Sequence, residues 1–228
     1  MDVDLVVPGL YCLRPEFGQA YLWLDGRSAT LVDTGIVGSG PAITALLTEL
    51  DADLDRIVIT HGHQDHAGSA AELRAATGAP VLAHAGDAAA IRGERPMPPP
   101  VLLDWERPLF DSIASNVPPN PPCPVDQEIA EGDVLDFGGG ARVLSIPGHT
   151  DGSVAIHLPR SEVLFAGDTI ANVDELMLGV FNVDRAKAIE SFRRLAELGT
   201  EIACFGHGDP LIGDAGAKLR AAAAKITG

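Results

Sequence analysis

The sequence has 228 residues, of which 46% are hydrophobic, and a formal net charge of −16 at pH 7. This length and composition can form a substantial core, whereas the negative charge disfavours nucleic acid and anionic membranes as partners, because both attract basic surfaces. The amino terminus lacks the pattern of a secretory signal, no apolar run approaches membrane-spanning length, and the three cysteines are scattered. We therefore expect a cytoplasmic, globular protein without a disulfide framework.

The first 92 residues alternate between strand and helix patterns, with turns marked by glycine and proline. The predicted elements are, in order, strand 21–25, strand 29–33, helix 41–50, strand 56–60, helix 68–77, strand 80–83 and helix 87–92.

A second series of elements begins after residue 124 and repeats this organisation. It comprises strands 133–137, 141–146, 153–158 and 162–166, helix 184–198 with Asp184 as its N-cap, strand 201–205 and helix 214–226. We therefore expect one α/β domain of residues 1–228, built from two similar halves of about 1–92 and 125–228. Two sheets sandwiched between outer helices would bury the apolar faces of both halves.

The segment 93–124 joins the halves and contains ten of the seventeen prolines. Proline at this density predicts neither a helix nor a central strand. Its apolar and aromatic residues, including Trp105 and Phe110, favour a lid that walls a substrate pocket, with a linker or a contact in a homodimer as alternatives. Met177 and Phe181 suggest a second wall at 172–183, where core packing is the equal alternative.

The stretch from Thr60 to Gly68 reads THGHQDHAG and directly follows a predicted strand. In extended chain, His61 and His63 point to the same side and can hold one metal ion together. Asp65 and His66 lie in the turn that opens the next helix, face another direction and could hold a second ion. A solvated polar turn rarely combines three imidazoles, so the motif predicts a metal site.

Two ions need more ligands than this motif supplies, and three later positions qualify. His149 follows a Pro-Gly turn, Asp168 follows a strand that ends in glycine, and His207 stands between two glycines after another strand. Glycine beside each candidate lets the backbone turn closely around a site.

The motifs HxHxDH, GHT, GDT and GHG, in this order between Leu31 and His207, resemble the metallo-β-lactamase superfamily and, within it, the glyoxalase-II-like hydrolases. The resemblance implies a four-layer αββα sandwich and two divalent ions, zinc foremost, with iron or manganese as alternatives. It also implies the ligands: His61, His63 and His149 for one ion, Asp65, His66 and His207 for the other, and Asp168 bridging both.

The chemistry implied by two ions about 3.5 to 4 Å apart is attack by a bridging hydroxide on a carbonyl that a metal polarises. Asp65 would lie beside the hydroxide and is the candidate proton shuttle. Asp33 could orient a ligand histidine, with a plain turn aspartate as the equal alternative, and Thr150 is a further candidate for such a role.

The substrate signatures of the nearest subfamilies are missing. Lactonases have a tyrosine where this chain has Ala171, and glyoxalase II enzymes have a basic and aromatic set where residues 172–176 are acidic and apolar. Class B β-lactamases generally lack an aspartate at the position of Asp168. We therefore expect a small-molecule ester, lactone or thioester of apolar character as the substrate. The alternatives are an acyl-homoserine lactonase and a mononuclear iron dioxygenase acting on persulfides, which would use only His61, His149 and Asp168.

Overall fold

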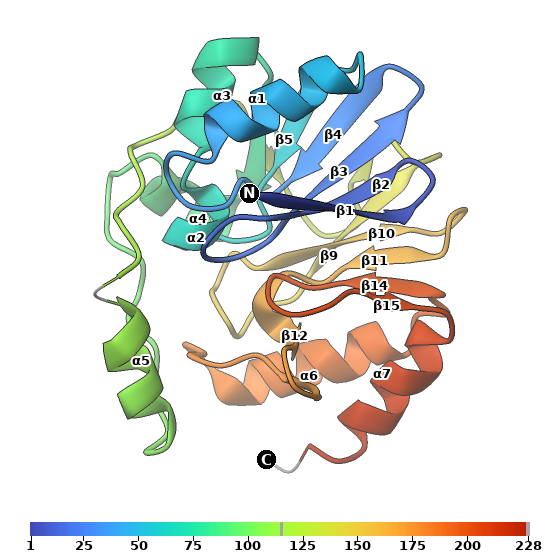
Figure 1. Ribbon diagram of the computed structural model, residues 1–228. Helices are drawn as coiled ribbons and strands as arrows, with labels where there is room; N and C mark the ends of the chain where they lie inside the picture. The colour runs from blue at the N-terminus through green and yellow to red at the C-terminus, as the bar shows by residue number, and fades with distance from the viewer. Residues whose placement is uncertain (115, 227–228) are drawn as a thin grey trace. The chain divides into compact units, whose positions relative to one another are not determined.

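The computed structural model describes residues 1–114 and 116–226 (Figure 1) and divides into two compact units. The first unit consists of Met1–Met97 with Val117–Ile129, and the second of Pro98–Asn116 with Ala130–Gly228. In the described part of the chain, none of the helices has the length and apolar character needed to span a bilayer.

The first unit is built on a seven-stranded mixed sheet with the strands in chain order. Strands β1 to β4 pair antiparallel, and β4 to β7 pair parallel. The strands are β1 (Asp2–Val7), β2 (Leu10–Arg14), β3 (Ala20–Asp25), β4 (Ser28–Val32), β5 (Asp53–Val58), β6 (Val81–His84) and β7 (Gln127–Ile129). The helices are α1 (Gly40–Glu49), α2 (Gln64–Ala67), α3 (Ala70–Thr77) and α4 (Ala85–Ile91).

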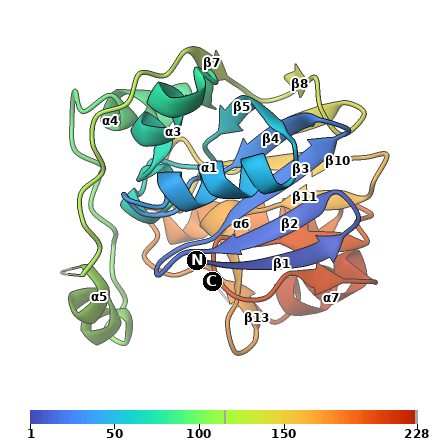
Figure 2. The same ribbon diagram turned by 45° about the horizontal axis from the view of Figure 1, so that its top comes forward.

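The core of the first unit lies between this sheet and its helices. Leu31 and Ile57 on neighbouring strands belong to one buried cluster with Ile43 of α1 and Leu73 of α3. Figure 2 shows α1 lying across the strands of the sheet. Because Ile43 and Leu47 are four residues apart, α1 turns one apolar face to the sheet.

The second unit contains a six-stranded mixed sheet in the order β15-β14-β11-β10-β9-β8 and a two-stranded sheet of β12 and β13. Its strands are β8 (Val134–Leu135), β9 (Ala141–Ser145), β10 (Val154–Leu158), β11 (Val163–Phe165), β12 (Ile170–Asn172), β13 (Leu176–Leu178), β14 (Ile202–Cys204) and β15 (Leu211–Ile212). Its helices are α5 (Glu106–Ala114), the 3-10 helix η1 (Gly167–Thr169), α6 (Arg185–Ala196) and α7 (Ala215–Ala223). Phe192 of α6 and Leu219 of α7 are buried in one cluster with Leu164 and Phe205.

Most elements lie where the sequence predicts them, and Asp184 does cap α6 by accepting the Lys187 N–H at 3.1 Å. The prediction of no helix between residues 93 and 124 is wrong, because α5 lies within this segment. Pro108 is tolerated in the first turn of α5, where backbone N–H groups have no intrahelical partner, and the next proline is Pro118.

The predicted helix 68–77 corresponds to α3, which begins two residues later at Ala70, and the short helix α2 before Gly68 was not predicted. A Cβ atom at Gly68 would overlap backbone atoms of Ile36 and Val37, so only glycine allows this approach. The strands that were not predicted are β1, β2, β7, β12, β13 and β15.

Asp126 connects three parts of the first unit. Its carboxylate accepts hydrogen bonds from Arg74 Nε and Nη2 on α3, at 2.9 and 2.7 Å, and from the Val81 N–H at the start of β6, at 2.9 Å. The Arg74 guanidinium, helped by the Val81 N–H, lowers the pKa of the Asp126 carboxyl to about 2. Asp126 therefore stabilises the fold through its charged form.

We predict that Asp126→Ala lowers the free energy of unfolding at neutral pH by about 1 kcal/mol. This is the upper end of the range for an ion pair that contacts solvent, as the pair of Arg74 and Asp126 does. A carboxyl whose pKa is lower in the folded state stabilises above its unfolded pKa, near 4, and loses this effect as the pH falls toward the folded value. In urea titrations, the difference from wild type should be constant from pH 7 to about 4 and shrink below it. A difference that is unchanged at pH 3 would show that the side chain acts by packing.

Candidate metal centre

Four candidate ligands of the first unit follow β5. The chain is still extended at His63, with φ −69° and ψ 157°, and α2 begins at Gln64, so Asp65 and His66 lie in the first turn of a helix. His61 and His66 are buried, and their ring centroids lie 4.1 Å apart. The strand-then-turn geometry expected from the spacing is therefore present.

Asp33 organises these histidines. It follows β4 with a left-handed backbone, φ 61°, and its Oδ1 accepts the Thr60 N–H at 2.7 Å. Its Oδ2 accepts hydrogen bonds from the Thr60 hydroxyl at 2.7 Å and from His66 Nδ1 at 2.9 Å. With its proton donated to Asp33, the Thr60 oxygen accepts from His61 Nδ1 at 3.1 Å. These contacts place a proton on Nδ1 of both imidazoles, so Nε2 is the nitrogen that could bind a metal ion.

The electrostatics and distances of this cluster suit a cation. Burial raises the pKa of the Asp33 carboxyl, and the adjacent His66 opposes that rise. Asp65 Oδ2 lies 3.6 Å from His66 Nε2. Two ligand atoms on one tetrahedral zinc ion are about 3.3 Å apart, given metal–ligand bonds of about 2.0 Å. Asp65 and His66 can therefore bind the same ion after a small adjustment.

Two residues that hold this loop had no role in the sequence analysis. Thr60 links Asp33 to His61, as described above. Asp87 on α4 is only 1% exposed, and its Oδ2 accepts the N–H of Gly62, which lies between the candidate ligands His61 and His63, at 2.9 Å. The sequence around Asp87 carries no signal for this contact, because the bond joins residues that are brought together only by the parallel pairing of β5 and β6.

Two candidate ligand histidines of the second unit converge on the carboxylate of a third candidate, Asp168. Asp168 lies in η1 directly after β11, and its Oδ2 is 3.6 Å from His149 Nε2 and 3.2 Å from His207 Nε2. The His149 and Asp168 side chains are largely buried, whereas that of His207 is 39% exposed. Both distances match the separation of ligands on a shared ion.

The backbone around these candidate ligands is tightly packed. His149 Nδ1 donates to the Val180 carbonyl oxygen at 3.1 Å, and the Val183 N–H donates to the His149 carbonyl oxygen at 3.2 Å. A Cβ at Gly179 would overlap the Asp168 carbonyl oxygen, so this position accommodates only glycine. Residues 179–183, the ligand-bracing loop, therefore contact the backbone of Asp168 and both the ring and the backbone of His149.

Thr150, the other candidate for orienting a ligand, contacts Ser153. Its hydroxyl lies 2.8 Å from the Ser153 hydroxyl, and its N–H donates to the same oxygen at 3.0 Å. These bonds stabilise the turn that carries His149, and a direct role of Thr150 toward a ligand stays a prediction.

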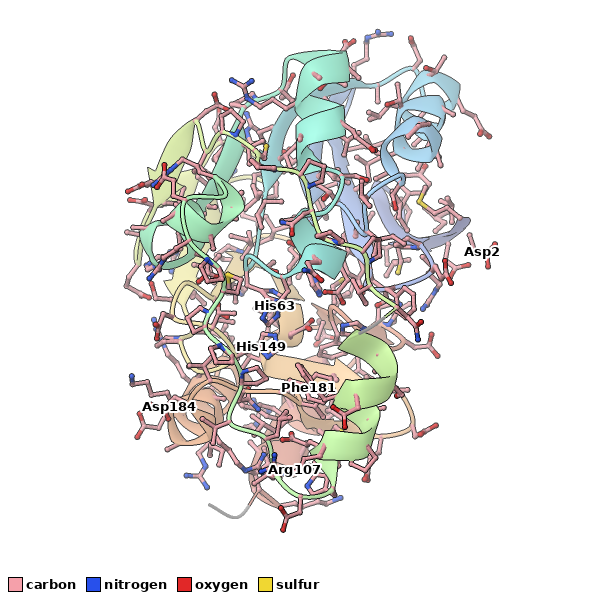
Figure 3. The ribbon with its side chains drawn as sticks, turned by 90° about the vertical axis from the view of Figure 1, so that its left-hand side faces the viewer. Asp2, His63, Arg107, His149, Phe181 and Asp184 are labelled. Carbon is pink, nitrogen blue, oxygen red and sulfur yellow. The ribbon has the colours of Figure 1, made fainter. Side chains whose placement is uncertain are left out.

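The four predicted pocket residues all belong to the second unit. Phe110 and Phe181 form an edge-to-face pair with ring centroids 5.2 Å apart, and Phe181 is labelled in Figure 3. Trp105 is 54% exposed, and Met177 lies on β13 opposite Ala171 of β12. The role of these four residues as substrate walls stays a prediction.

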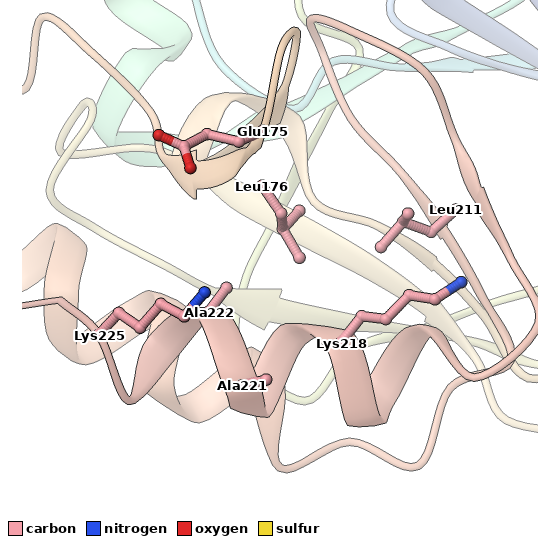
Figure 4. Close-up of a pocket in the computed structure, with 7 residues that line it drawn as sticks. All are labelled: Glu175, Leu176, Leu211, Lys218, Ala221, Ala222 and Lys225. Carbon is pink, nitrogen blue, oxygen red and sulfur yellow. The ribbon is translucent and has the colours of Figure 1, made fainter.

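A separate pocket of about 270 Å³ lies between β13, β15 and α7 (Figure 4). It is lined by Glu175, Leu176, Leu211, Lys218, Ala221, Ala222 and Lys225. None of the predicted ligands is in its lining, so this pocket is distinct from the candidate metal centre.

Comparisons with known proteins identify the family to which this chain is similar. Residues 13–207 match the family described as the metallo-beta-lactamase superfamily. A hydroxyacylglutathione hydrolase of Cereibacter sphaeroides is 32% identical over 211 residues, which cover 91% of this chain and 67% of that protein. The α/β fold class expected from the sequence is confirmed by two solved structures.

The first is a metallo-beta-lactamase family protein, TTHA1429, from Thermus thermophilus. It has a TM-score of 0.71 and 25% identity over 96% of this chain and 78% of its own. The second, TTHA1623 in a di-iron-bound form, has a TM-score of 0.69 and 29% identity over 88% of this chain and 92% of its own.

We predict that Asp33→Asn weakens metal binding by about 10- to 100-fold, as is usual when a group that orients a ligand is lost. Asparagine tolerates the left-handed backbone, but its NH₂ group would face the donors of Thr60 and His66. Competition with a chromophoric chelator measures the affinity. Asp51→Asn is the matched control, because Asp51 also has a left-handed backbone (φ 52°) but is exposed. Equal affinities of the two variants would contradict the role of Asp33.

Proposed function

The chain belongs to the metallo-β-lactamase superfamily and is a metal-dependent hydrolase, and we propose that it uses two divalent ions to hydrolyse an ester, lactone or thioester of apolar character. The observation that carries this proposal is the position of Asp168. One of its carboxylate oxygens, Oδ2, lies within 3.6 Å of Nε2 of both His149 and His207. A carboxylate in contact with two imidazoles is suited to be shared between two ions.

The proposed ligand sets follow the family pattern. His61, His63 and His149 would bind one ion, Asp65, His66 and His207 the other, and Asp168 both. The donor chemistry within each unit supports this assignment. His61, His66 and His149 each have their Nδ1 engaged by Thr60, Asp33 and Val180 respectively, so each would bind through Nε2. Neutral imidazoles and carboxylates suit zinc, with iron or manganese as alternatives.

Bound divalent ions supply an acidified water and a Lewis acid for the carbonyl oxygen of the substrate. The side chains of the protein would hold the ligands in place and accept the proton that the water releases. Asp65, in the first turn of α2, is the proposed proton acceptor. Asp33 holds the rings of His66 and, through Thr60, of His61, so neither ligand needs to reorient during the reaction.

The residues after Asp168 bear on the substrate class. The relative from Cereibacter is named for hydrolysis of a hydroxyacylglutathione, which is a thioester. Here the connection between β12 and β13 carries Val173, Asp174 and Glu175, and two carboxylates would repel the anionic glutathione moiety. The aromatic pair of Phe110 and Phe181 favours an apolar acyl group. We therefore propose a small, apolar ester, lactone or thioester without an anionic carrier.

Metal quantification and a substrate panel on the same preparation test this function. We expect two ions per chain and hydrolysis within a panel of apolar esters, lactones and thioesters. His61→Ala should lower kcat/KM by more than the roughly 100-fold loss seen when only a ligand-orienting group is removed. The control is His84→Asn, since His84 lies outside the proposed ligand set and asparagine can replace it as the N-cap of α4.

Two results would contradict the proposal. The first is a fully loaded protein that hydrolyses no member of the panel. The second is a single iron ion with uptake of oxygen in the presence of a persulfide, which would identify the dioxygenase alternative.

A further inference from the structure

Part of the proline-rich segment is attached to the ligand-bracing loop. The Val101 N–H donates to the Asn182 carbonyl oxygen at 2.9 Å, and the Phe181 N–H donates to Glu106 Oε1 at 3.3 Å. The ring of Phe110 lies edge to face against that of Phe181. Three contacts from one segment therefore hold the backbone and the side chain around Phe181.

Glu106 is the central residue of this attachment. It is the first residue of α5, and its Oε2 accepts the Leu103 N–H at 2.8 Å while the Glu106 N–H donates to the Leu103 carbonyl oxygen at 3.0 Å. This reciprocal pair resembles a capping box and would function equally well in solvent. Glu106 is nevertheless only 2% exposed. Removing a carboxylate from water costs solvation free energy, so it is buried only where hydrogen bonds compensate for the loss. Here the second oxygen of Glu106 accepts the Phe181 N–H.

Phe181 has a backbone that requires such support. Its φ is 60°, in the left-handed region that a bulky L-residue rarely adopts. The contacts with Glu106 and Phe110 hold the residue in this conformation. On its amino-terminal side, the Val180 carbonyl oxygen accepts from His149 Nδ1, and on its carboxyl-terminal side, the Val183 N–H donates to the His149 carbonyl oxygen. The turn at Phe181 thus sets both groups that hold His149.

We propose that Glu106 is a positioning residue for His149. By holding Phe181 in its left-handed conformation, it places the Val180 carbonyl where it fixes the ring of His149 and directs Nε2 toward a metal ion. The segment from 98 to 114 then supports the ligand-bracing loop at the metal site, in addition to connecting secondary-structure elements. This inference rests on the proposed role of His149 as a ligand.

Glu106→Gln tests the role with little change in shape. Glutamine keeps one carbonyl acceptor but places an NH₂ group opposite the N–H of either Leu103 or Phe181. We expect Co²⁺ and Zn²⁺ affinity, measured by chelator competition, to fall about tenfold. The visible absorption of the Co²⁺-loaded protein should change, and kcat should fall more than KM rises, because the substrate is still bound. Arg107→Gln is the matched control, since Arg107 is the next residue of α5 and is exposed.

Phe110→Leu provides a second variant that does not depend on the folding of the first. Leucine keeps an apolar side chain on α5 but removes the ring contact with Phe181. It should shift metal affinity and the Co²⁺ spectrum in the same direction as Glu106→Gln.

His149→Ala separates the inference from the function on which it rests. If His149→Ala loses metal while both brace variants keep wild-type affinity and spectrum, the positioning role is overturned and the proposed function stands. If His149→Ala keeps wild-type metal affinity, the ligand assignment is wrong and the positioning role falls with it. If all three lose affinity while Arg107→Gln does not, the inference is supported.

Discussion

The buried carboxylate of Asp33 is the constraint on which the candidate ligands of the first unit depend. It lies at the end of β4 and accepts hydrogen bonds from the backbone and hydroxyl of Thr60 and from the ring of His66. A carboxylate removed from water is tolerated only when its oxygens are satisfied, so these three bonds must form together. They join the end of β4 to the loop after β5 and to α2, and they fix the rings of two histidines without occupying the nitrogens that would bind metal.

The second unit uses the same arrangement for a different purpose. In each unit, an aspartate follows one strand, and a histidine-bearing loop follows that strand's parallel neighbour: β4 beside β5, and β11 beside β14. Because parallel neighbours end at the same edge of a sheet, residues far apart in the chain are brought together there. Asp33 turns its carboxylate toward Nδ1 of His66 and orients it, whereas Asp168 faces Nε2 of His149 and His207 and can itself be a ligand.

The sequence predicted most of the secondary structure, but it did not predict all the residues that support the candidate site. Periodicity and turn residues predicted most strands and helices, because each has one buried face or a marked end. The helix α5 was missed because the proline content of residues 93–124 was considered as a whole. Within α5, the proline Pro108 lies in the first turn, where a helix tolerates it. Asp87 and Glu106 were also missed. Asp87 accepts a hydrogen bond from the Gly62 N–H and Glu106 accepts one from the Phe181 N–H, and a backbone N–H leaves no pattern in a sequence.

The sequence alone thus determined which residues can bind a divalent ion, that these residues follow strands, and which of them share a strand face or a turn. These properties depend on residue type and on spacings of a few positions. The tertiary structure decided that Nδ1 of His61, His66 and His149 is engaged by the protein, which carboxylate orients a histidine and which faces the ligand atoms, and that residues 98–114 brace the loop at His149. Those features depend on distances between residues that only strand pairing and helix packing bring together.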